Sequence, residues 1–414
     1  MIIHLPCGKT TIPMDIAPNR VITSRIGELK GGNGSALVEQ AMARPIGSAR
    51  LSELAVGKKT CTVIISDHTR PVPSRDILPH MLRELRQGNP QMDITLLVAT
   101  GCHRETTGEE LAKKLGDIAK TEKIVVHDAF DSNANVQIGI LPSGAPLVID
   151  RLAVETDLLV AEGFIEPHFF AGFSGGRKSV LPGVCDKVTV YGNHCGAFIA
   201  HDKARTGVLE GNPIHRDMEA AAEMAKLAYV VNVVIDEEKR TVAAFAGDFR
   251  EAHAAGVEFL RKYCQVPPVY GDIVVTTNGG APLDQNLYQC VKGLTAAEAT
   301  VNPGGTIILC AEMADGIGGE QFYLDMKNCE TPKALFEAFC ATPQAETVAD
   351  QWQTQILCRV LKEYRVIFVT RPEMKKTIEE MKMEYAPSLE VALQMAGNGS
   401  VTVIPDGVSV CIYK

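Results

Sequence analysis

The amino-acid sequence predicts an α/β protein with two α/β domains, mainly parallel sheets, and an active site in the cleft between the domains. The first observation is length, because 414 residues exceed what one ordinary hydrophobic core accommodates. The second is that short β-branched runs alternate with amphipathic helical stretches, which is typical of parallel sheets. The third is a proline-rich joint at residues 266–268, followed by a new strand. We therefore predict an N-terminal domain over residues 1–268 and a C-terminal domain over residues 269–414.

The individual elements follow from apolar periodicity. Residues 74–87 carry apolar side chains at helical spacing, from Ile77 to Leu85, which predicts an amphipathic helix between the first two strands. Two hairpins are expected, one over residues 2–5 and 11–14 and one over residues 229–235 and 241–245. The other predicted strands cover residues 61–66, 94–99, 123–127 and 158–161 in the N-terminal domain, and 273–277, 306–310, 365–370 and 401–404 in the C-terminal domain.

Composition narrows the class of protein. A hydrophobic content of 46% with 22% charged residues is typical of a folded globular chain, and a net charge of −9 argues against nucleic acid as a partner. Twelve cysteines without a C-x-x-C pair favour reduced thiols over a disulfide framework or a zinc site. No apolar run reaches membrane-spanning length. We expect a cytoplasmic protein that binds neither nucleic acid nor membranes.

The most informative segment is the loop from His168 to Lys178, which combines an imidazole, a glycine run and an amine. Glycines without Cβ let backbone N–H groups close on an anion, and an amine beside them can act as a charge or a nucleophile. The loop is not a phosphate-binding P-loop, because Arg177 occupies the position of that motif's second glycine. A solvated turn is the plain alternative, but the phenylalanines in this loop predict partial burial.

Polar residues follow several predicted strands directly, where parallel sheets bind ligands. At these positions a structural interpretation competes with a functional one. Asp67 is either a helix cap or a residue of the functional site. Gln289 and Lys292 lie on one helical face, either as a solvated surface pair or as residues that bind a ligand. His68 is expected to face solvent. The residues expected to converge on one crevice are Asp67, Arg70, His103, Glu166, His168, Tyr288, Gln289 and Lys292.

The histidines carry the candidate chemistry. His103, after a glycine at a strand end, is the stronger candidate for general acid/base work, and His127 is a weaker rival. His194 is either a metal ligand or a residue at a helix start, and its neighbour Cys195 is a possible soft ligand. We expect His215 and His253 to be surface or packing residues.

These motifs, in this order, resemble one family: the nickel-pincer-nucleotide-dependent lactate racemases and related 2-hydroxyacid racemases and epimerases. The resemblance covers nearly the whole chain, and its most specific part is the His168 loop with His194. The matching segments are Ser66-Asp67-x-Thr69-Arg70-Pro71, Thr100-Gly101-x-His103, His168-x-x-Ala171-Gly172-x-Ser174-Gly175-Gly176-x-Lys178, Gly192-Asn193-His194 and Tyr288-Gln289-x-x-Lys292.

The resemblance implies a role for each matched residue. Lys178 would tether the cofactor, a pyridinium-3-thioamide-5-thiocarboxylic acid mononucleotide carrying nickel, and His194 would be the protein's ligand to the nickel. His103 and His168 would be acid/base partners on opposite faces of the substrate. The N-terminal domain would then be the cofactor-binding catalytic domain, with the C-terminal domain closing over the cleft. Arg70 and Lys292 would hold the substrate carboxylate, and Asp67, Ser174, Tyr288 and Gln289 would support the cofactor or its phosphate.

The implied reaction inverts Cα of lactate or a related 2-hydroxy acid by reversible hydride transfer to the cofactor, while a histidine takes the hydroxyl proton. Cofactor-biosynthesis proteins would be partners. Two alternatives stay open: a non-catalytic nucleotide- or phosphate-binding regulatory protein, and a hydrolase with His103, His168 and His194 around one metal ion. The sequence also leaves open the particular 2-hydroxy acid, the oligomeric state, any metal ligation by Cys195, and whether the strand after Val408 returns to the N-terminal domain.

Overall fold

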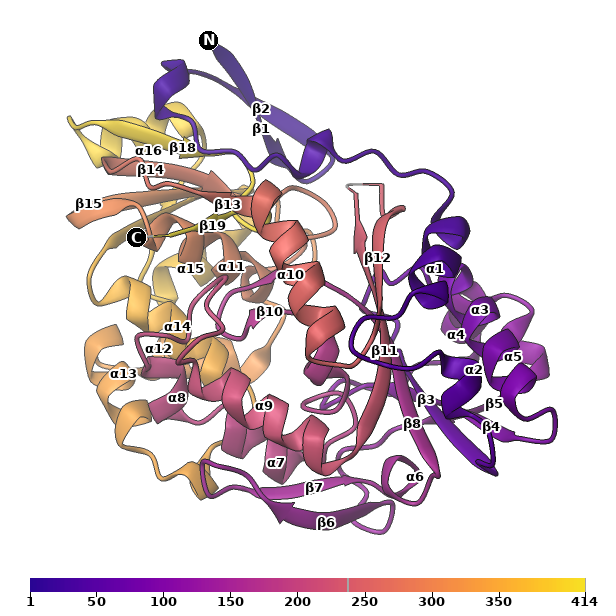
Figure 1. Cartoon of the computed structure of the whole chain (residues 1–414). Helices are drawn as coiled ribbons and strands as arrows, with labels where there is room; N and C mark the ends of the chain where they lie inside the picture. Colours follow the sequence, from indigo (N-terminus) through magenta and orange to yellow (C-terminus); the bar gives the residue numbers. More distant parts are fainter. Residues whose placement is uncertain (237, 414) are drawn as a thin grey trace.

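The computed structural model describes residues 1–236 and 238–413, and it contains two separate parallel sheets (Figure 1). The first sheet has six strands in the order β12-β11-β8-β3-β4-β5, and only β12 runs antiparallel to its neighbour. Its strands are β3 (Thr60–Ser66), β4 (Asp93–Ala99), β5 (Lys123–Val126), β8 (Leu158–Phe164), β11 (Leu227–Ile235) and β12 (Thr241–Gly247).

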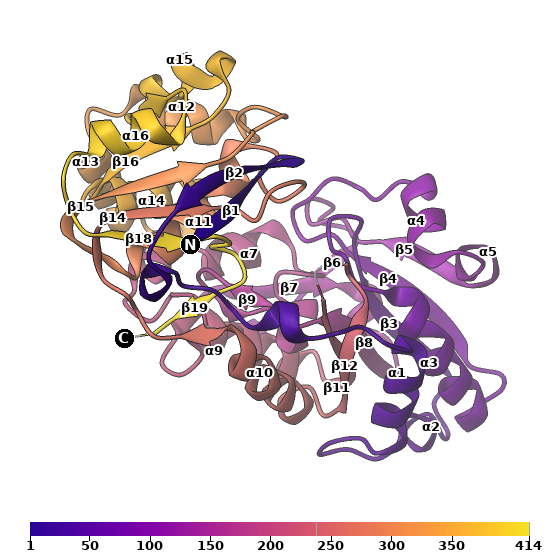
Figure 2. The same ribbon diagram turned by 90° about the horizontal axis from the view of Figure 1, so that it is seen from above.

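The second sheet has five strands in the order β17-β16-β15-β14-β18, and every pair is parallel. Figure 2 shows the two sheets as separate bodies with helices between and around them. Its strands are β14 (Gly271–Thr277), β15 (Val301–Cys310), β16 (Arg365–Val369), β17 (Glu384–Ala386) and β18 (Val401–Ile404). The predicted fold class is therefore confirmed.

One face of the first sheet is covered by the amphipathic helix that the periodicity predicts. This helix, α3 (Ser74–Gly88), buries Ile77, Met81 and Leu85 against β3, β4 and β8. Helices α1 (Gly34–Ala43) and α2 (Leu51–Leu54) pack beside α3 in the same core. The flanking helices on this side are α4 (Gly108–Leu115) and α5 (Ile118–Thr121), whereas α6 (Arg151–Val154) packs with Ala153 on the opposite face of the sheet.

The facing sides of the two sheets share one continuous apolar core. It runs from Ile64 and Leu159 of the first sheet to Ile307 and Leu309 of the second. Helices α8 and α14 pack against each other in the middle of this core. The helices of this layer are α7 (Lys187–Asn193), α8 (Gly196–Ala200), α9 (Pro213–Met224), α11 (Leu287–Glu298), α12 (Glu320–Asn328), α13 (Pro332–Ala341) and α14 (Gln351–Leu361). The two sheets are thus held in a fixed relation by apolar burial.

The two ends of the chain cross between the halves. The N-terminal hairpin packs on the second sheet, since Leu5 shares a core with Val275 and Val403. At the other end, β19 (Cys411–Ile412) pairs with β13 (Gln265–Val266), and Cys411 packs against Phe173 and Ile165 of the first half. The strand after Val408 therefore returns to the N-terminal half. The division at residue 268 stays a prediction, although the hairpin belongs by its packing with the second sheet.

The remaining elements complete the chain, and the shortest of them have too few residues for an apolar periodicity to predict them. They are the hairpin strands β1 (Ile2–Cys7) and β2 (Thr10–Asp15), β6 (Asn135–Ile140) with β7 (Pro146–Asp150), β9 (Pro167–His168) with β10 (Gly172–Phe173), the helices α10 (Glu251–Cys264), α15 (Lys375–Glu380) and α16 (Leu389–Ala396), and 3-10 turns at Pro18–Arg20, Ile26–Glu28, Gly176–Ser179, Gln344–Glu346 and Pro372–Met374. Across residues 1–236 and 238–413, no helix is both long and apolar enough to cross a membrane.

The hairpin packing makes a stability prediction. Leu5→Ala should lower the free energy of unfolding by about 2–5 kcal/mol, because Leu5 is fully buried and its removal leaves a cavity. Ile2→Ala is the matched control, since Ile2 is 67% exposed on the same strand. Urea denaturation of both variants measures the difference. Equal stability of the two variants would show that the hairpin does not belong to this core.

Candidate active site

The loops that carry the predicted residues meet at one edge of the first sheet. Strands β8, β3 and β4 are neighbours and parallel, so the segments after them leave the sheet side by side. These segments hold Asp67 and Arg70, then His103, and then the loop from Glu166 to Lys178. Helix α11 of the second sheet adds Tyr288, Gln289 and Lys292. The site is therefore built from both halves of the chain.

Asp67 and His103 form a close pair. The Asp67 carboxylate is 1% exposed, and its Oδ2 lies 2.7 Å from His103 Nδ1. Its Oδ1 accepts hydrogen bonds from the hydroxyl and amide of Thr69 at 2.7 and 3.2 Å. Burial alone would raise the pKa of Asp67, but the bond and charge of His103 and the Thr69 hydroxyl outweigh burial and lower it. The capping interpretation is wrong, because Asp67 does not bond to the start of α3.

The pairing fixes how His103 can act. A carboxylate accepts hydrogen bonds, so Nδ1 carries the hydrogen and Nε2 keeps a free lone pair. The His103 side chain is 46% exposed and faces a depression of about 420 Å³ lined also by Arg104, Asp128 and Phe130. His103 is therefore an oriented base open to a small molecule.

The rival candidate His127 is structural. Its Nδ1 lies 3.0 Å from Asp150 and its Nε2 lies 3.0 Å from the Cys185 carbonyl, so both ring nitrogens are engaged in the core. His68 does not face solvent as expected, because its Nδ1 bonds to the Thr106 hydroxyl at 3.0 Å and the ring is largely covered.

Positive side chains gather around His168. Burial lowers the pKa of His168 well below its ordinary value, and the charges of Lys178, Arg70 and Lys292 lower it further. Burial likewise lowers the pKa of Lys178 strongly, with help from Arg177 and Arg70, and lowers the pKa of Lys292 to about 8. His168, Lys178 and Lys292 are each partly buried and keep some accessible surface. Because Lys178 and Lys292 both lower the pKa of His168, one lysine from each half of the chain lies near this histidine.

His168 is held by its own loop. It lies on β9, which pairs with β10 so that His168 faces Gly172 across the ladder. The amide of Ala171 donates to His168 Nδ1 at 3.3 Å, and the rings of Phe169 and Phe170 lie 5.2 and 4.6 Å from the imidazole. Because the amide is a donor, Nδ1 is the acceptor and the hydrogen resides on Nε2. His103 and His168 are therefore held as opposite tautomers.

His194 is a buried imidazole with an unused nitrogen. It ends α7, its ring lies between Phe170 at 5.0 Å and Trp352 at 5.2 Å, and its Nδ1 is buried without a hydrogen-bond partner among the described residues. Burial and the charge of Lys178 lower its pKa to about 3, against a smaller opposing effect of the Val190 carbonyl. A neutral imidazole with a free lone pair is what a metal ion requires.

Cys195 presents a protonated thiol instead. Burial raises its pKa, although the amides of Phe198 and Ala197 act in the opposite direction. Since the thiolate is the metal-binding form, the structure favours His194 over Cys195 as a ligand. Across the described residues, no group of three or more His, Cys, Asp or Glu side chains is arranged to hold a metal ion. The hydrolase alternative, which needs three histidines on one ion, therefore gains no support.

Three predicted cofactor residues have other contacts. The Ser174 hydroxyl donates to the Phe164 carbonyl at 2.8 Å and accepts from the Glu166 amide at 2.9 Å, so it braces the loop. The Tyr288 hydroxyl donates to Asp350 at 2.8 Å. Gln289 lies half-buried one turn before Lys292 on α11. Their contribution to cofactor binding stays a prediction.

The glycine-rich loop is not an open cradle for an anion. The amide of Ser174 donates to the Glu166 carbonyl, that of Gly176 to Asn232 Oδ1, and that of Lys178 to the Gly175 carbonyl. These N–H groups are used inside the protein. The expectation that this backbone closes on a phosphate is wrong for these positions.

Sequence analysis did not identify two residues of this region, because they come from distant segments of the chain. Trp352 contacts His194, and Asp350 binds Tyr288, but both lie in the second half, outside any motif. The signal for Trp352 was its being the chain's only tryptophan. Arg177 was noted only as a departure from the P-loop pattern.

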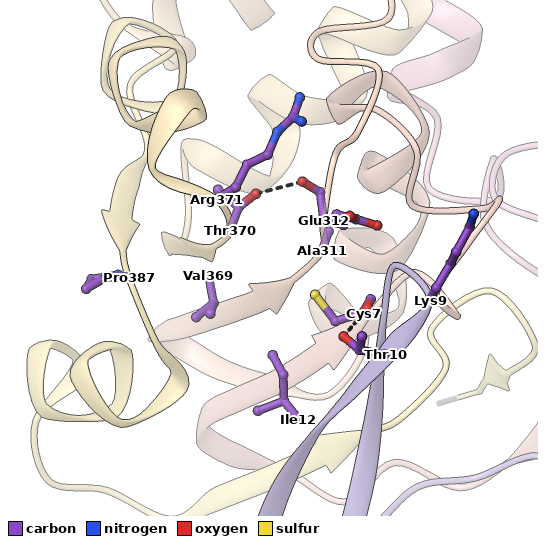
Figure 3. Close-up of a pocket in the computed structure, with 10 residues that line it drawn as sticks. All are labelled: Cys7, Lys9, Thr10, Ile12, Ala311, Glu312, Val369, Thr370, Arg371 and Pro387. Atoms are coloured by element: carbon purple, nitrogen blue, oxygen red, sulfur yellow. Dashed lines mark hydrogen bonds between the residues drawn. The ribbon is translucent and has the colours of Figure 1, made fainter.

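A second cavity of about 250 Å³ lies under the N-terminal hairpin, at the ends of β15 and β16 (Figure 3). Its polar groups are partly engaged, since Thr370 bonds to the Glu312 carbonyl and Thr10 to the Cys7 carbonyl. None of the predicted site residues lines it.

The buried histidines predict a pH dependence of stability. His168, His194, His215 and His253 all have lowered pKa values in the folded protein, whereas an unfolded histidine titrates near 6.5. Below about pH 6.5 the unfolded chain therefore binds more protons, and the free energy of unfolding should fall as pH decreases. His215→Gln should lose less stability than the wild type between pH 7 and 5. Urea denaturation of the apoprotein tests this, and identical slopes would contradict the burial of a neutral His215.

Comparison with known proteins identifies the family. The family model of the lactate racemase N-terminal domain matches residues 7–207, and that of the lactate racemase C-terminal domain matches residues 266–412. The lactate racemase of Thermoanaerobacterium thermosaccharolyticum is 48% identical over 100% of this chain and 99% of its own. That of Lactiplantibacillus plantarum is 50% identical over 91% of this chain and 90% of its own.

Solved structures agree. The lactate racemase apoprotein from T. thermosaccharolyticum superposes with a TM-score of 0.96 at 47% identity, covering both chains fully. A Thermotoga maritima protein, with a TM-score of 0.67 and 19% identity over 93% of this chain and all of its own, shares the fold alone. The chain belongs to the lactate racemase family and is an isomerase of the racemase type.

Proposed function

We propose that this protein racemises lactate, or a closely related 2-hydroxy acid, with a nickel-pincer nucleotide tethered to Lys178. The observation that carries the proposal is the side-chain set of the cleft: an amine, an imidazole with an unused buried nitrogen, and two further histidines among positive charges. The named relatives are lactate racemases, which supports lactate as the substrate.

The residues fit such a cofactor. Within the described residues, no carboxylate lies within 4.0 Å of the Lys178 amine, and Nζ lies 5.8 Å from the centroid of the Phe170 ring. The lowered pKa of Lys178 favours the neutral amine, the form that can hold a group through a thioamide. His194 offers a neutral nitrogen to nickel, and the cationic walls suit an anionic mononucleotide. When bound, this group would supply a hydride acceptor, which no side chain of the protein provides.

Arg70 and Lys292 would bind the substrate carboxylate. The guanidinium of Arg70 can grip a carboxylate with two hydrogen bonds, and it lies on the exposed side of the cleft. Lys292 approaches from α11 of the other half, so a bound carboxylate would bridge the two halves. A carboxylate between them would also relieve the repulsion that lowers the pKa of Lys292.

His103 is suited to remove the hydroxyl proton. Its Nε2 has a free lone pair, and the imidazolium that forms would keep its Nδ1–H bond to Asp67. The buried carboxylate thus stabilises the charge that the proton transfer creates. Asp67 acts in this proposal through His103 and not through the cofactor.

His168 is suited to the opposite task. Burial and three nearby cations make its imidazolium unstable, so once protonated it would give up its proton readily. To serve both directions of a racemisation, each histidine would take the hydroxyl proton from one enantiomer and return a proton to form the other, with the protons of the two rings exchanged with solvent between turnovers. The proposal places them on opposite faces of the substrate.

The proposal also covers the location of the protein in the cell and its partners. We propose a cytoplasmic location, because all twelve cysteines are free thiols. Loading of Lys178 would require contact with cofactor-biosynthesis proteins. The net charge of −9 supports neither a nucleic-acid nor a membrane-surface partner.

The function is tested with L-lactate deuterated at Cα, using protein produced together with the cofactor-making enzymes. Hydride transfer predicts D-lactate that retains most of its deuterium and a slowed chemical step. Proton abstraction by a histidine would instead wash the deuterium into solvent. A panel of other chiral 2-hydroxy acids identifies the substrate, and failure to invert any of them would refute the proposal.

The two histidines have a symmetrical kinetic signature. Because two enantiomers have equal free energy, kcat/KM is the same in both directions, and any variant must lower both equally. His103→Ala and His168→Ala should each reduce kcat/KM by at least ~10²-fold with the cofactor still bound. Loss of stability or loading, with normal turnover per loaded site, would show the histidines to be merely structural.

A further inference from the structure

Arg177 lies in the middle of the loop that ends in Lys178, and its side chain points into the protein. It is 1% exposed and ranks among the largest fully buried side chains of the described chain. The mechanism proposed above does not use it. Its position is the one where a P-loop would have a glycine, so its presence needs its own physical explanation.

The guanidinium binds the loop's own backbone. Nη2 donates to the Ala171 carbonyl at 2.8 Å, and Nη1 donates to the Phe173 and Gly175 carbonyls at 2.8 and 3.2 Å. Nε donates to His215 Nδ1 on α9 at 2.9 Å. The guanidinium carries its donors on three separate nitrogens and can span acceptors on both sides of its plane edge, whereas a lysine carries all three of its N–H donors on one nitrogen.

His253 of α10 completes the arrangement. Its Nε2 lies 2.8 Å from the Ser174 carbonyl, which can only accept, so Nε2 is the donor. Four carbonyls of the loop, at residues 171, 173, 174 and 175, are thus turned inward onto Arg177 and His253. Gly176 has a φ of +55° and a Cβ there would lie 2.7 Å from His253 Cγ, which explains the glycine at this position.

The charge of Arg177 has no direct counterion. Among the described residues, no carboxylate oxygen lies within 4.0 Å of it, and the nearby Glu219 contacts His215 instead, at 3.5 Å. Burial and the charge of Arg177 lower the pKa values of both His215 and His253, so these rings are neutral acceptors or donors. A buried cation is costly unless hydrogen bonds compensate it. Here the compensation comes from the loop carbonyls.

We propose that Arg177 is a positioning residue for Lys178: residues 171–176 fold around its guanidinium, and this fixes how the Lys178 side chain enters the cleft. The role of Lys178 rests on the proposed function, whereas the folding of the loop around Arg177 does not. Burial lowers the pKa of Lys178, and the charges of Arg177 and Arg70 lower it further against the effect of Glu166, which favours the neutral amine. His168 and His194 are the titratable rings that feel the charge of Lys178.

Amide hydrogen exchange in the full-length apoprotein tests the proposal. The reporters are the amides of Ser174, Gly176 and Lys178, whose hydrogen bonds exist only in the folded loop. Arg177→Met removes the fork and the charge, and Arg177→Lys keeps the charge but loses the fork. Both variants should exchange these amides at least ~10-fold faster than the wild type.

Arg359→Met is the matched control. Arg359 is also buried and donates to both oxygens of Glu298 at 2.9 and 2.8 Å, on α14 and away from the loop. Its loss should lower global stability without a selective effect on the three amides. Wild-type exchange in the Arg177 variants, or the same rise in Arg359→Met, would overturn the proposal. If Arg177→Met does not fold, Arg177→Lys alone decides.

Cofactor loading gives a second readout without any activity measurement. After production with the cofactor-making enzymes, peptide mass analysis gives the fraction of Lys178 that carries an adduct. This fraction should fall at least ~10-fold in Arg177→Met and stay near wild type in Arg359→Met. An unmodified Lys178 in wild-type protein would refute the tether, and the exchange data would still judge Arg177 by itself. Full loading of Arg177→Met would overturn the positioning role.

Discussion

The active site depends on burying more positive than negative charge where the two halves of the chain meet. Arg177, Lys178 and Lys292 lose much of their contact with water, and Arg70 adds its charge from the open side. Glu166 acts against this positive charge at Lys178 and Lys292, and Glu219 does so at Arg177. Such a cluster is unfavourable for the empty protein and favourable for an anion. In the proposed function, the burial of these groups and the repulsion among them would favour binding of an anionic cofactor and a carboxylate substrate.

A charge cluster of this kind needs a rigid support, and the shared core provides it. If the two sheets moved freely, Lys292 would swing away from Arg70 and the repulsion would be relieved without a ligand. The apolar core that runs from Leu159 to Ile307 prevents this, with α8 and α14 packed between the sheets. Hydrophobic burial therefore offsets the electrostatic cost of the site.

The sequence predicted the fold class, the long strands and α3, because each has enough residues for its periodicity to show. It also predicted that Asp67, His103 and His168 follow strand ends and that Lys292 lies near them on a helix, and the effect of Lys292 on the pKa of His168 supports the proximity of these two residues. It did not predict the packing of the β1–β2 hairpin on the second sheet, or the contact of Trp352 with His194. Those depend on the relative placement of segments more than 150 residues apart in the chain, and no local pattern encodes it. Hydrogen-bond partners, such as Asp67 for His103, were equally outside the reach of spacing.

The glycine-rich loop shows that a glycine-rich sequence does not always form the anion site that such sequences usually form. In a phosphate-binding loop the glycines turn backbone N–H groups outward onto an anion. Here the carbonyls of Ala171, Phe173 and Gly175 point inward onto the Arg177 guanidinium, a cation that the chain itself supplies. The loop therefore satisfies its polar backbone internally and leaves Lys178 as the group presented to the cleft. A noncovalent anion site would release its ligand at equilibrium. An amine held on a loop of this kind can instead hold a ligand through a covalent bond. A cofactor that must stay in place through every turnover requires such a bond.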